Sequence, residues 1–150
     1  MGAWIAVLVA RLRPEKIAAL LLLAPAADFS EVLMWNKMTP EIKGEIMEKG
    51  EWQRPSAYGD DPYPITRAFI EDGRRNLILN APIELACPVH VLQGMKDPDV
   101  PWQHALALID RLSGNPTLTL IKEGDHRLST PDDLKRIEAA LDTILADLAM

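Results

Sequence analysis

The sequence has a single cysteine, Cys87, and its three histidines, His90, His104 and His126, lie far apart. A lone cysteine excludes an internal disulfide framework and a zinc site built from several cysteines. The histidine spacing offers no short metal-ligand motif on one helix. Small disulfide-stabilised scaffolds and short zinc motifs are therefore excluded.

Long apolar stretches and excess positive charge are also lacking. The longest apolar runs, Ala3–Ala10 and Ile17–Ala27, are shorter than the ~20 residues that a membrane-spanning helix needs. Sixteen Lys and Arg against 22 Asp and Glu give a net charge of −6, which argues against nucleic acid or an anionic membrane as partner. The basic residues come after the first apolar run, the wrong order for a secretory signal, so we expect a cytoplasmic location.

Strand-like and helix-like patterns alternate along the 150 residues, whose composition is that of one globular domain. The expected helices cover Gly2–Leu12, which is expected to be buried, Thr39 to about Lys49, Ile65–Leu79 and Trp102–Leu112. A final amphipathic helix begins at Thr130 and is expected to pack one face against a core, the face made of Leu134, Ile137, Leu141, Ile144, Leu145 and Leu148. The expected strands are Ile17–Ala24, Pro88–Gly94 and Thr117–Ile121, and the expected loops are Ala26–Met38 and Glu51–Pro64, the second a loop or weak hairpin. Ile17–Ala24 also fits a short buried helix, but a parallel core strand suits its length. This order predicts an α/β fold with a parallel sheet.

Polar residues come directly after two strands that are expected to be neighbours. Asp97 and Asp99 come after Pro88–Gly94, and Asp125 and His126 come after Thr117–Ile121. Functional groups gather at the carboxyl ends of parallel strands, so an acid and an imidazole on these loops can meet. A carboxylate bonded to one ring nitrogen leaves the other free to act as a base. The competing interpretation is that these are turn formers, with Asp99 capping the helix that starts near Trp102.

The other residues with reactive or aromatic side chains have simpler expected roles. His90 alternates with valines and is expected to be structural, His104 to be solvated on an exposed helix, and Cys87 to fill space. The four tryptophans could line an apolar pocket, although core packing is the commoner role. No serine (Ser30, Ser56, Ser113, Ser129) stands in a G-x-S-x-G nucleophile motif.

Three stretches resemble the α/β-hydrolase superfamily. Gly94–Pro101 matches the G-x-x-D-x-x-V-P loop, Gly124-Asp125-His126 matches the loop that carries the catalytic histidine, and Met1-Gly2-Ala3-Trp4 resembles the residues directly after the nucleophilic serine. Further stretches, Arg13–Lys16, Lys49–Trp52, Pro55-Ser56 with Tyr58 and Val100–Trp102, resemble the mammalian mitochondrial acyl-protein thioesterase subfamily, which acts on S-palmitoyl groups and acyl glucuronides.

The resemblance implies a partial α/β-hydrolase fold, made of the C-terminal parallel strands, their flanking helices and a helical cap insertion at about 29–79 within a single domain, 1–150. It implies a carboxylic ester or thioester hydrolase with Asp97 and His126 in a triad and the Met1 N–H in the oxyanion hole. Met34, Trp35, Met38 and Trp52 are the expected substrate-binding residues, and no metal or organic cofactor is implied. The nucleophilic serine would stand just before Met1, so the activity of these 150 residues alone is open.

Two alternatives remain at this point. The chain could be a non-catalytic remnant that binds a partner or forms a homodimer through the exposed edge of the strand Ile17–Ala24. It could also be a small esterase in which His126, oriented by Asp97, activates water directly, although nothing obvious supplies the electrostatic stabilisation this needs.

Overall fold

The computed structural model describes residues 1–55 and 61–149, which form two compact units. The first unit joins Met1–Ala27 to Ile78–Met150, and the second is Asp28–Leu77. The second unit coincides closely with the expected insertion at about 29–79; that it caps a substrate pocket stays a prediction. Ser56 and Tyr58, which contributed to the resemblance, lie outside the described residues.

The first unit is built on a three-stranded parallel sheet, in the order β1 (Leu20–Leu23), β4 (Val89–Gly94), β5 (Thr117–Ile121). Leu22 pairs with Val91, and Leu92 pairs with Thr119. The central strand β4 is the most deeply buried of the three, as expected of a strand covered on both faces. The predicted parallel α/β architecture is therefore confirmed, although β1 is four residues long and not the eight expected.

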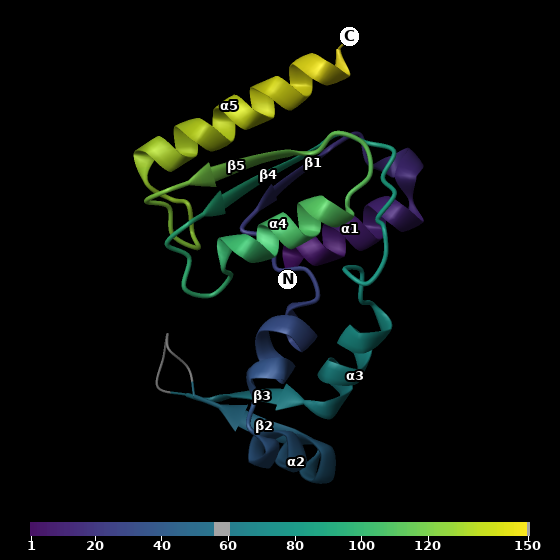
Figure 1. The fold of residues 1–150 in the computed structure, drawn as a ribbon, viewed down its shortest axis with the longest axis vertical. Coiled ribbons are helices and arrows are strands. Elements are labelled where there is room, and N and C mark those ends of the chain that lie inside the picture. Colours follow the sequence, from purple (N-terminus) through teal and green to yellow (C-terminus); the bar gives the residue numbers. More distant parts are fainter. Residues whose placement is uncertain (56–60, 150) are drawn as a thin grey trace. The chain divides into compact units, whose positions relative to one another are not determined.

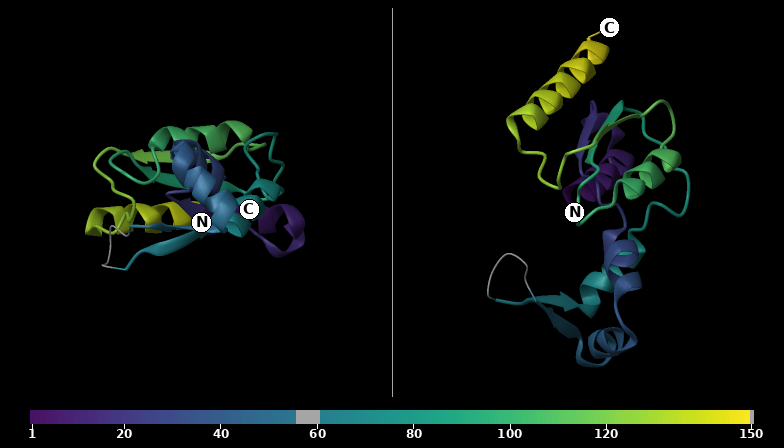
Figure 2. Two further views of the ribbon diagram at one scale, coloured as in Figure 1. Left: turned by 90° about the horizontal axis from the view of Figure 1, so that it is seen from below. Right: turned by 60° about the vertical axis from the view of Figure 1, so that its left-hand side comes forward.

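Helices cover both faces of this sheet (Figures 1 and 2). α5 (Pro131–Leu148) lies over one face, and α1 (Gly2–Leu12) and α4 (Trp102–Arg111) lie over the other. A short 3₁₀ turn, Pro14–Lys16, joins α1 to β1. As the sequence predicted, Thr130 caps α5 by accepting a hydrogen bond from the Asp133 N–H.

Two helices of the first unit bury less than the sequence suggested. The expectation of a buried helix at Gly2–Leu12 is wrong, because only one face of α1 is buried, and Leu12 is 74% exposed. α5 buries Ala140 and Ile144, but four leucines expected in its core-facing stripe are exposed: Leu134, Leu141, Leu145 and Leu148. Helical periodicity identified which residues share a face and not how much of that face is covered.

The second unit has its own small core. Its elements are a π-helical turn (Ser30–Met34), a 3₁₀ turn (Trp35–Lys37), α2 (Pro40–Lys49), the antiparallel pair β2 (Glu51–Arg54) and β3 (Tyr63–Thr66), and α3 (Arg67–Arg75). The core consists of Ile46, Ile65 and Ile70. Thr39 caps α2 and Gly50 ends it at a φ of 89°, so the predicted bounds of this helix are confirmed.

Two other expectations in the second unit need correction. Ala26–Met38 is not wholly a loop, since helical turns fill Ser30–Lys37. The helix expected at Ile65–Leu79 is shorter at both ends, since α3 runs from Arg67 to Arg75. It starts late because Ile65 pairs in β3 and the Thr66 hydroxyl caps the helix by accepting from the Phe69 N–H. Of the two interpretations of Glu51–Pro64, the hairpin is confirmed.

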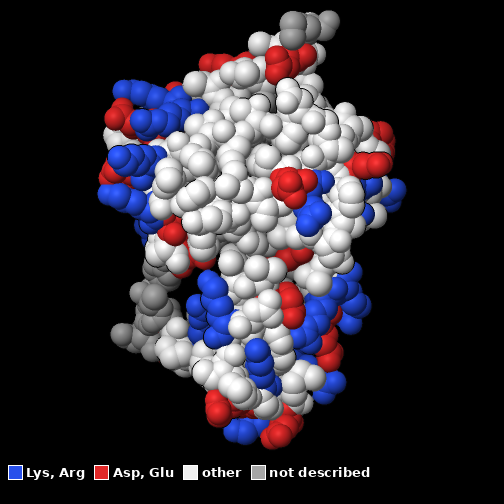
Figure 3. Space-filling view, viewed as in Figure 1, with Lys and Arg blue, Asp and Glu red and all other residues white. Residues whose placement is uncertain are grey.

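Charge is spread unevenly over the surface (Figure 3). On the face shown, much of the first unit is uncharged, whereas charges of both signs gather over the second unit. Among residues 1–55 and 61–149, no helix combines the length and the apolar character that a bilayer crossing requires.

Candidate active site

The site lies where β4 and β5 end. Gly94, the last residue of β4, pairs with Ile121, the last residue of β5, so the loops after them start side by side. Two backbone hydrogen bonds of 2.9 Å join the loops, from the Met95 N–H to the Ile121 carbonyl and from the Lys96 N–H to the Gly124 carbonyl. An ion pair between Lys96 and Glu123 adds an exposed link. The parallel pairing thus brings the two predicted loops together.

Gly94 allows this close approach. A Cβ at position 94 would lie 2.3 Å from the Gly124 carbonyl oxygen and 2.5 Å from that of Asp125. Both neighbours are backbone atoms of the histidine loop, so they cannot move aside as a flexible side chain would. Glycine is therefore required here for contact between the loops and not for an unusual backbone conformation.

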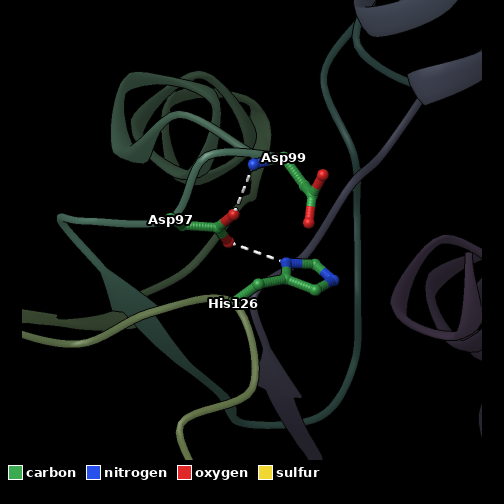
Figure 4. Close-up of side chains that lie close together, drawn as sticks. All are labelled: Asp97, Asp99 and His126. Carbon is green, nitrogen blue, oxygen red and sulfur yellow. Dashed lines mark hydrogen bonds and ion pairs between the residues drawn. The ribbon is translucent and has the colours of Figure 1, made fainter. Parts of the chain in front are cut away.

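Asp97 and His126 form a direct hydrogen bond, as the sequence predicted (Figure 4). The His126 Nδ1 lies 2.8 Å from the Asp97 Oδ2. An ionised carboxylate only accepts hydrogen bonds, so Nδ1 carries the proton and the outer nitrogen, Nε2, is left with a lone pair in the neutral ring. The Asp97 side chain is fully buried, whereas that of His126 is 44% exposed. The geometry gives a base that a reacting group can reach and a buried acid that orients it.

Four hydrogen bonds converge on the Asp97 carboxylate. Oδ1 accepts from the Asp99 and Val100 N–H groups, each at 2.8 Å, and Oδ2 accepts from His126 and, at 3.1 Å, from the Gln93 Nε2. Burial alone would raise the pKa of Asp97, but these bonds, led by that from Val100, outweigh it and hold the pKa below its ordinary value. Asp97 is therefore charged at neutral pH and able to stabilise an imidazolium.

Asp99 lies beside this pair. Its carboxylate, that of Asp97 and a His126 ring nitrogen are within 4.8 Å of one another, the spacing of a possible metal site. The four hydrogen bonds already use the acceptor positions of Asp97, so an ion would have to displace at least one of them. The N-cap position of α4 is occupied by Pro101, which makes no side-chain cap hydrogen bond, and the alternative role of Asp99 in capping this helix stays a prediction.

The other histidines and the cysteine lie apart from this pair. His104 is buried, not solvated as expected, and its Nε2 lies 2.6 Å from the Ala27 carbonyl oxygen, so it links α4 to the segment after β1. His90 fits its expected structural role, with Nε2 2.9 Å from the Thr119 hydroxyl on β5. Partial burial raises the pKa of the Cys87 thiol, which makes it a poor nucleophile.

The residues expected to bind substrate lie in the second unit. Met34, Trp35, Met38 and Trp52 are partly buried and pack against its isoleucine core. The Arg74 guanidinium lies 4.5 Å from the Trp35 ring centre, and the Lys43 ammonium lies 5.5 Å from it. These contacts give the four side chains a structural role, and a role in lining an acyl pocket stays a prediction.

Met1, the expected oxyanion-hole residue, precedes the first turn of α1. Its carbonyl accepts from the Trp4 N–H at 3.0 Å, and partial burial lowers the pKa of its amino group. The structure thus places this nitrogen at a helix start, where N–H groups are favourable to a developing negative charge. Its role in an oxyanion hole stays a prediction.

Sequence reasoning missed one residue of the site, Gln93. It is wholly buried at the end of β4, directly before the matched Gly94 loop. A polar residue near the last position of an otherwise apolar strand is the signal that could have found it.

Comparison with known proteins agrees with this geometry. No protein-family model matches the chain. A putative hydrolase from Agrobacterium vitis superposes with a TM-score of 0.88 at 39% identity, over 96% of this chain and 58% of that one. Mouse alpha/beta hydrolase domain-containing protein 10 superposes with a TM-score of 0.84 at 34% identity, over 97% of this chain and 59% of that one. The chain therefore shares the fold of the α/β-hydrolase superfamily.

Within this superfamily, the chain is homologous to mammalian palmitoyl-protein thioesterases. It is 37% identical to the mitochondrial palmitoyl-protein thioesterase ABHD10 of Mus musculus over 99% of its own length. The chain spans about half the length of the curated relatives it matches. These relatives are named as mitochondrial proteins, so the expectation of a cytoplasmic location is contradicted. That expectation rested on the order of charge and apolar residues at the first positions of this sequence, which is not informative about a leader.

The close contact at Gly94 yields a prediction. Gly94→Ala should separate the two loops and weaken the Asp97–His126 hydrogen bond, because its Cβ would collide with backbone atoms. We expect a loss of unfolding free energy of about 1–3 kcal/mol, the usual range for overpacking. Gly44→Ala is the control, since a Cβ at this helical position meets nothing within 4 Å, and alanine favours the helix. Urea unfolding of both variants tests this; equal stabilities would contradict it.

The low pKa of Asp97 predicts a pH dependence of stability. Its pKa is lower in the folded than in the unfolded chain, so its stabilising contribution is present above the ordinary value of 3.8 and is lost as the pH falls through the folded value. The stability difference between the unmutated chain and Asp97→Asn should therefore shrink on acidification below 3.8. Asp132→Asn, at a side chain that is 75% exposed, is the control. A difference for Asp97→Asn that stays constant with pH would refute this assignment.

Proposed function

We propose that this chain supplies the acid and the base of a serine-hydrolase triad that cleaves carboxylic esters or thioesters. The observation that carries the proposal is the 2.8 Å hydrogen bond between Asp97 and His126 at the ends of adjacent parallel strands. The mammalian relatives are named as palmitoyl-protein thioesterases, which supports a long-chain acyl thioester as the substrate class. Such a substrate carries an apolar acyl group, a reactive carbonyl and a thiolate leaving group.

In the proposed reaction, the Nε2 of His126 takes up a proton and gives it away again in each of two halves. In the first half, Nε2 takes the proton of a serine hydroxyl as the serine oxygen attacks the acyl carbonyl, and the imidazolium then protonates the leaving sulfur or oxygen. In the second half, Nε2 takes a proton from the water that attacks the acyl-serine carbonyl and then gives it to the serine oxygen, which leaves and so releases the acid. Asp97 stays ionised throughout and stabilises the imidazolium. No metal or organic cofactor enters this scheme.

The serine itself is proposed to come from a segment outside these 150 residues. None of the four serines of the chain stands in a nucleophile motif. In this arrangement the backbone N–H of Met1 would come directly after the nucleophile and point at the developing oxyanion. The second unit would cap the acyl group, with Met34, Trp35, Met38 and Trp52 as candidate lining.

The decisive assay compares this chain with one that includes the residues encoded directly upstream of Met1. We expect the longer chain to hydrolyse an S-palmitoylated peptide, to lose turnover by on the order of 10⁶ in His126→Ala, and by about 10⁴ in Asp97→Asn. His90→Asn, which changes a histidine outside the pair, should retain activity.

Three outcomes of this assay distinguish the serine mechanism from direct activation of water by His126. An in-frame stop codon directly upstream, or turnover unaffected by His126→Ala, would contradict the triad. Hydrolysis by the 150 residues alone that disappears in His126→Ala would favour direct activation of water instead. Activity that appears only in the longer chain would support the serine mechanism.

For a partner, we propose a second copy of the chain at the outer edge of β1. Among the described residues no strand pairs with this edge, and Leu23 is 40% exposed. Unpaired apolar edges favour strand addition. Light scattering should therefore show a dimer. Leu23→Lys should dissociate this dimer, whereas Leu120→Lys, at a similarly exposed leucine on β5, should preserve it. A monomer for the unmutated chain would overturn this proposal.

A further inference from the structure

Gln93 contacts the catalytic pair from the interior of the first unit. Its Nε2 lies 3.1 Å from the Asp97 Oδ2, 3.0 Å from the Gly94 carbonyl oxygen and 3.1 Å from the Val100 carbonyl oxygen. All three partners are acceptors, so the NH₂ end of the amide must face them. The side chain therefore bridges the base of the 94–100 loop and reaches the carboxylate that the loop carries.

The two oxygens of Asp97 are held differently. Oδ1 is fixed by two backbone N–H groups of its own loop, Asp99 and Val100. One anchored oxygen leaves the carboxylate free to pivot about that point. Oδ2 is held on one side by His126, whose side chain is 44% exposed, and on the other by the fully buried Gln93. Gln93 thus supplies the rigid second point that sets where Oδ2 faces.

The other end of this amide argues against a role in packing alone. The Gln93 Oε1 is buried and has no hydrogen-bond partner among the described residues. A buried acceptor without a partner is destabilising, whereas an apolar side chain of similar size would fill the same space without this penalty. The gain that offsets it lies at the NH₂ end, which bonds the Asp97 carboxylate together with the Gly94 and Val100 carbonyls.

We propose that Gln93 is a positioning residue for the Asp97–His126 pair: its amide fixes the carboxylate so that Oδ2 accepts from Nδ1 and leaves Nε2 as the base. This inference rests on the proposed function, in which Nε2 is the reacting nitrogen. Gln93 touches neither substrate nor serine, and acts only through Asp97.

The test measures which ring nitrogen of His126 carries the proton. Substitution of a residue that merely packs would not change this tautomer. The tautomer of a neutral imidazole is set by the hydrogen bond that its protonated nitrogen makes. Long-range ¹H–¹⁵N NMR of this 150-residue chain, above the pH at which the ring is charged, distinguishes the two forms. In the unmutated chain the Nδ1–H form should dominate.

The informative variant is Gln93→Met, which keeps the volume and removes the donor. We expect the Nδ1–H form of His126 to fall below half of the neutral population. Gln53→Met, at an exposed glutamine of β2, is the matched control and should leave the tautomer unchanged. In the longer, active chain, Gln93→Met should lower kcat by about 10- to 100-fold, as for other partners that orient a functional imidazole, and leave KM within about twofold.

If Gln93→Met does not fold, a second variant still tests the proposal. Gln93→Glu keeps the shape, and its introduced carboxyl can donate to Asp97 only while protonated, so the Nδ1–H form should decline as the pH rises. An Nδ1–H form that persists in the folded variant, whichever is used, would overturn the role of Gln93 while leaving the triad intact. If the unmutated chain itself lacks the Nδ1–H form, the proposed function fails instead.

Discussion

The structure of the site depends on one contact, the backbone approach between the ends of β4 and β5. Parallel pairing brings Gly94 beside Ile121, and the absence of a side chain at position 94 lets the adjoining loops touch through main-chain hydrogen bonds. Asp97 and His126 are 29 residues apart in sequence, yet they meet because each stands a few positions beyond this contact. The Asp97 side chain is fully buried, which makes its hydrogen bonds stronger than they would be in water.

Sequence patterns were sufficient for the parts of the fold that obey local rules. Capping threonines at positions 39 and 130 and the left-handed Gly50 marked helix ends, and the alternation of strands and helices predicted the parallel sheet. The acid–base pair was also predictable, because the topology brings consecutive parallel strand ends to one edge of the sheet. These inferences needed only the order of elements and the residues at the end of each strand.

Burial and tertiary contact were less predictable. The exposed leucines of α5 show the correct spacing for a core-facing stripe, but spacing cannot show whether another element covers them. His104 was expected in solvent because it starts a helix, but it is buried, and its ring hydrogen-bonds to the carbonyl of Ala27, a partner that is distant in sequence. Gln93 was missed for a similar reason: its partners are brought together only by the return of the 94–100 loop.

The double-mutant cycle of Asp97→Asn and His126→Ala is the most direct measurement of the central contact. If the two side chains are hydrogen-bonded as described, their effects on the free energy of unfolding near pH 7 are coupled by at least about 0.5 kcal/mol. Effects that add to within about 0.3 kcal/mol would show that the side chains do not interact, and would contradict the account of the site.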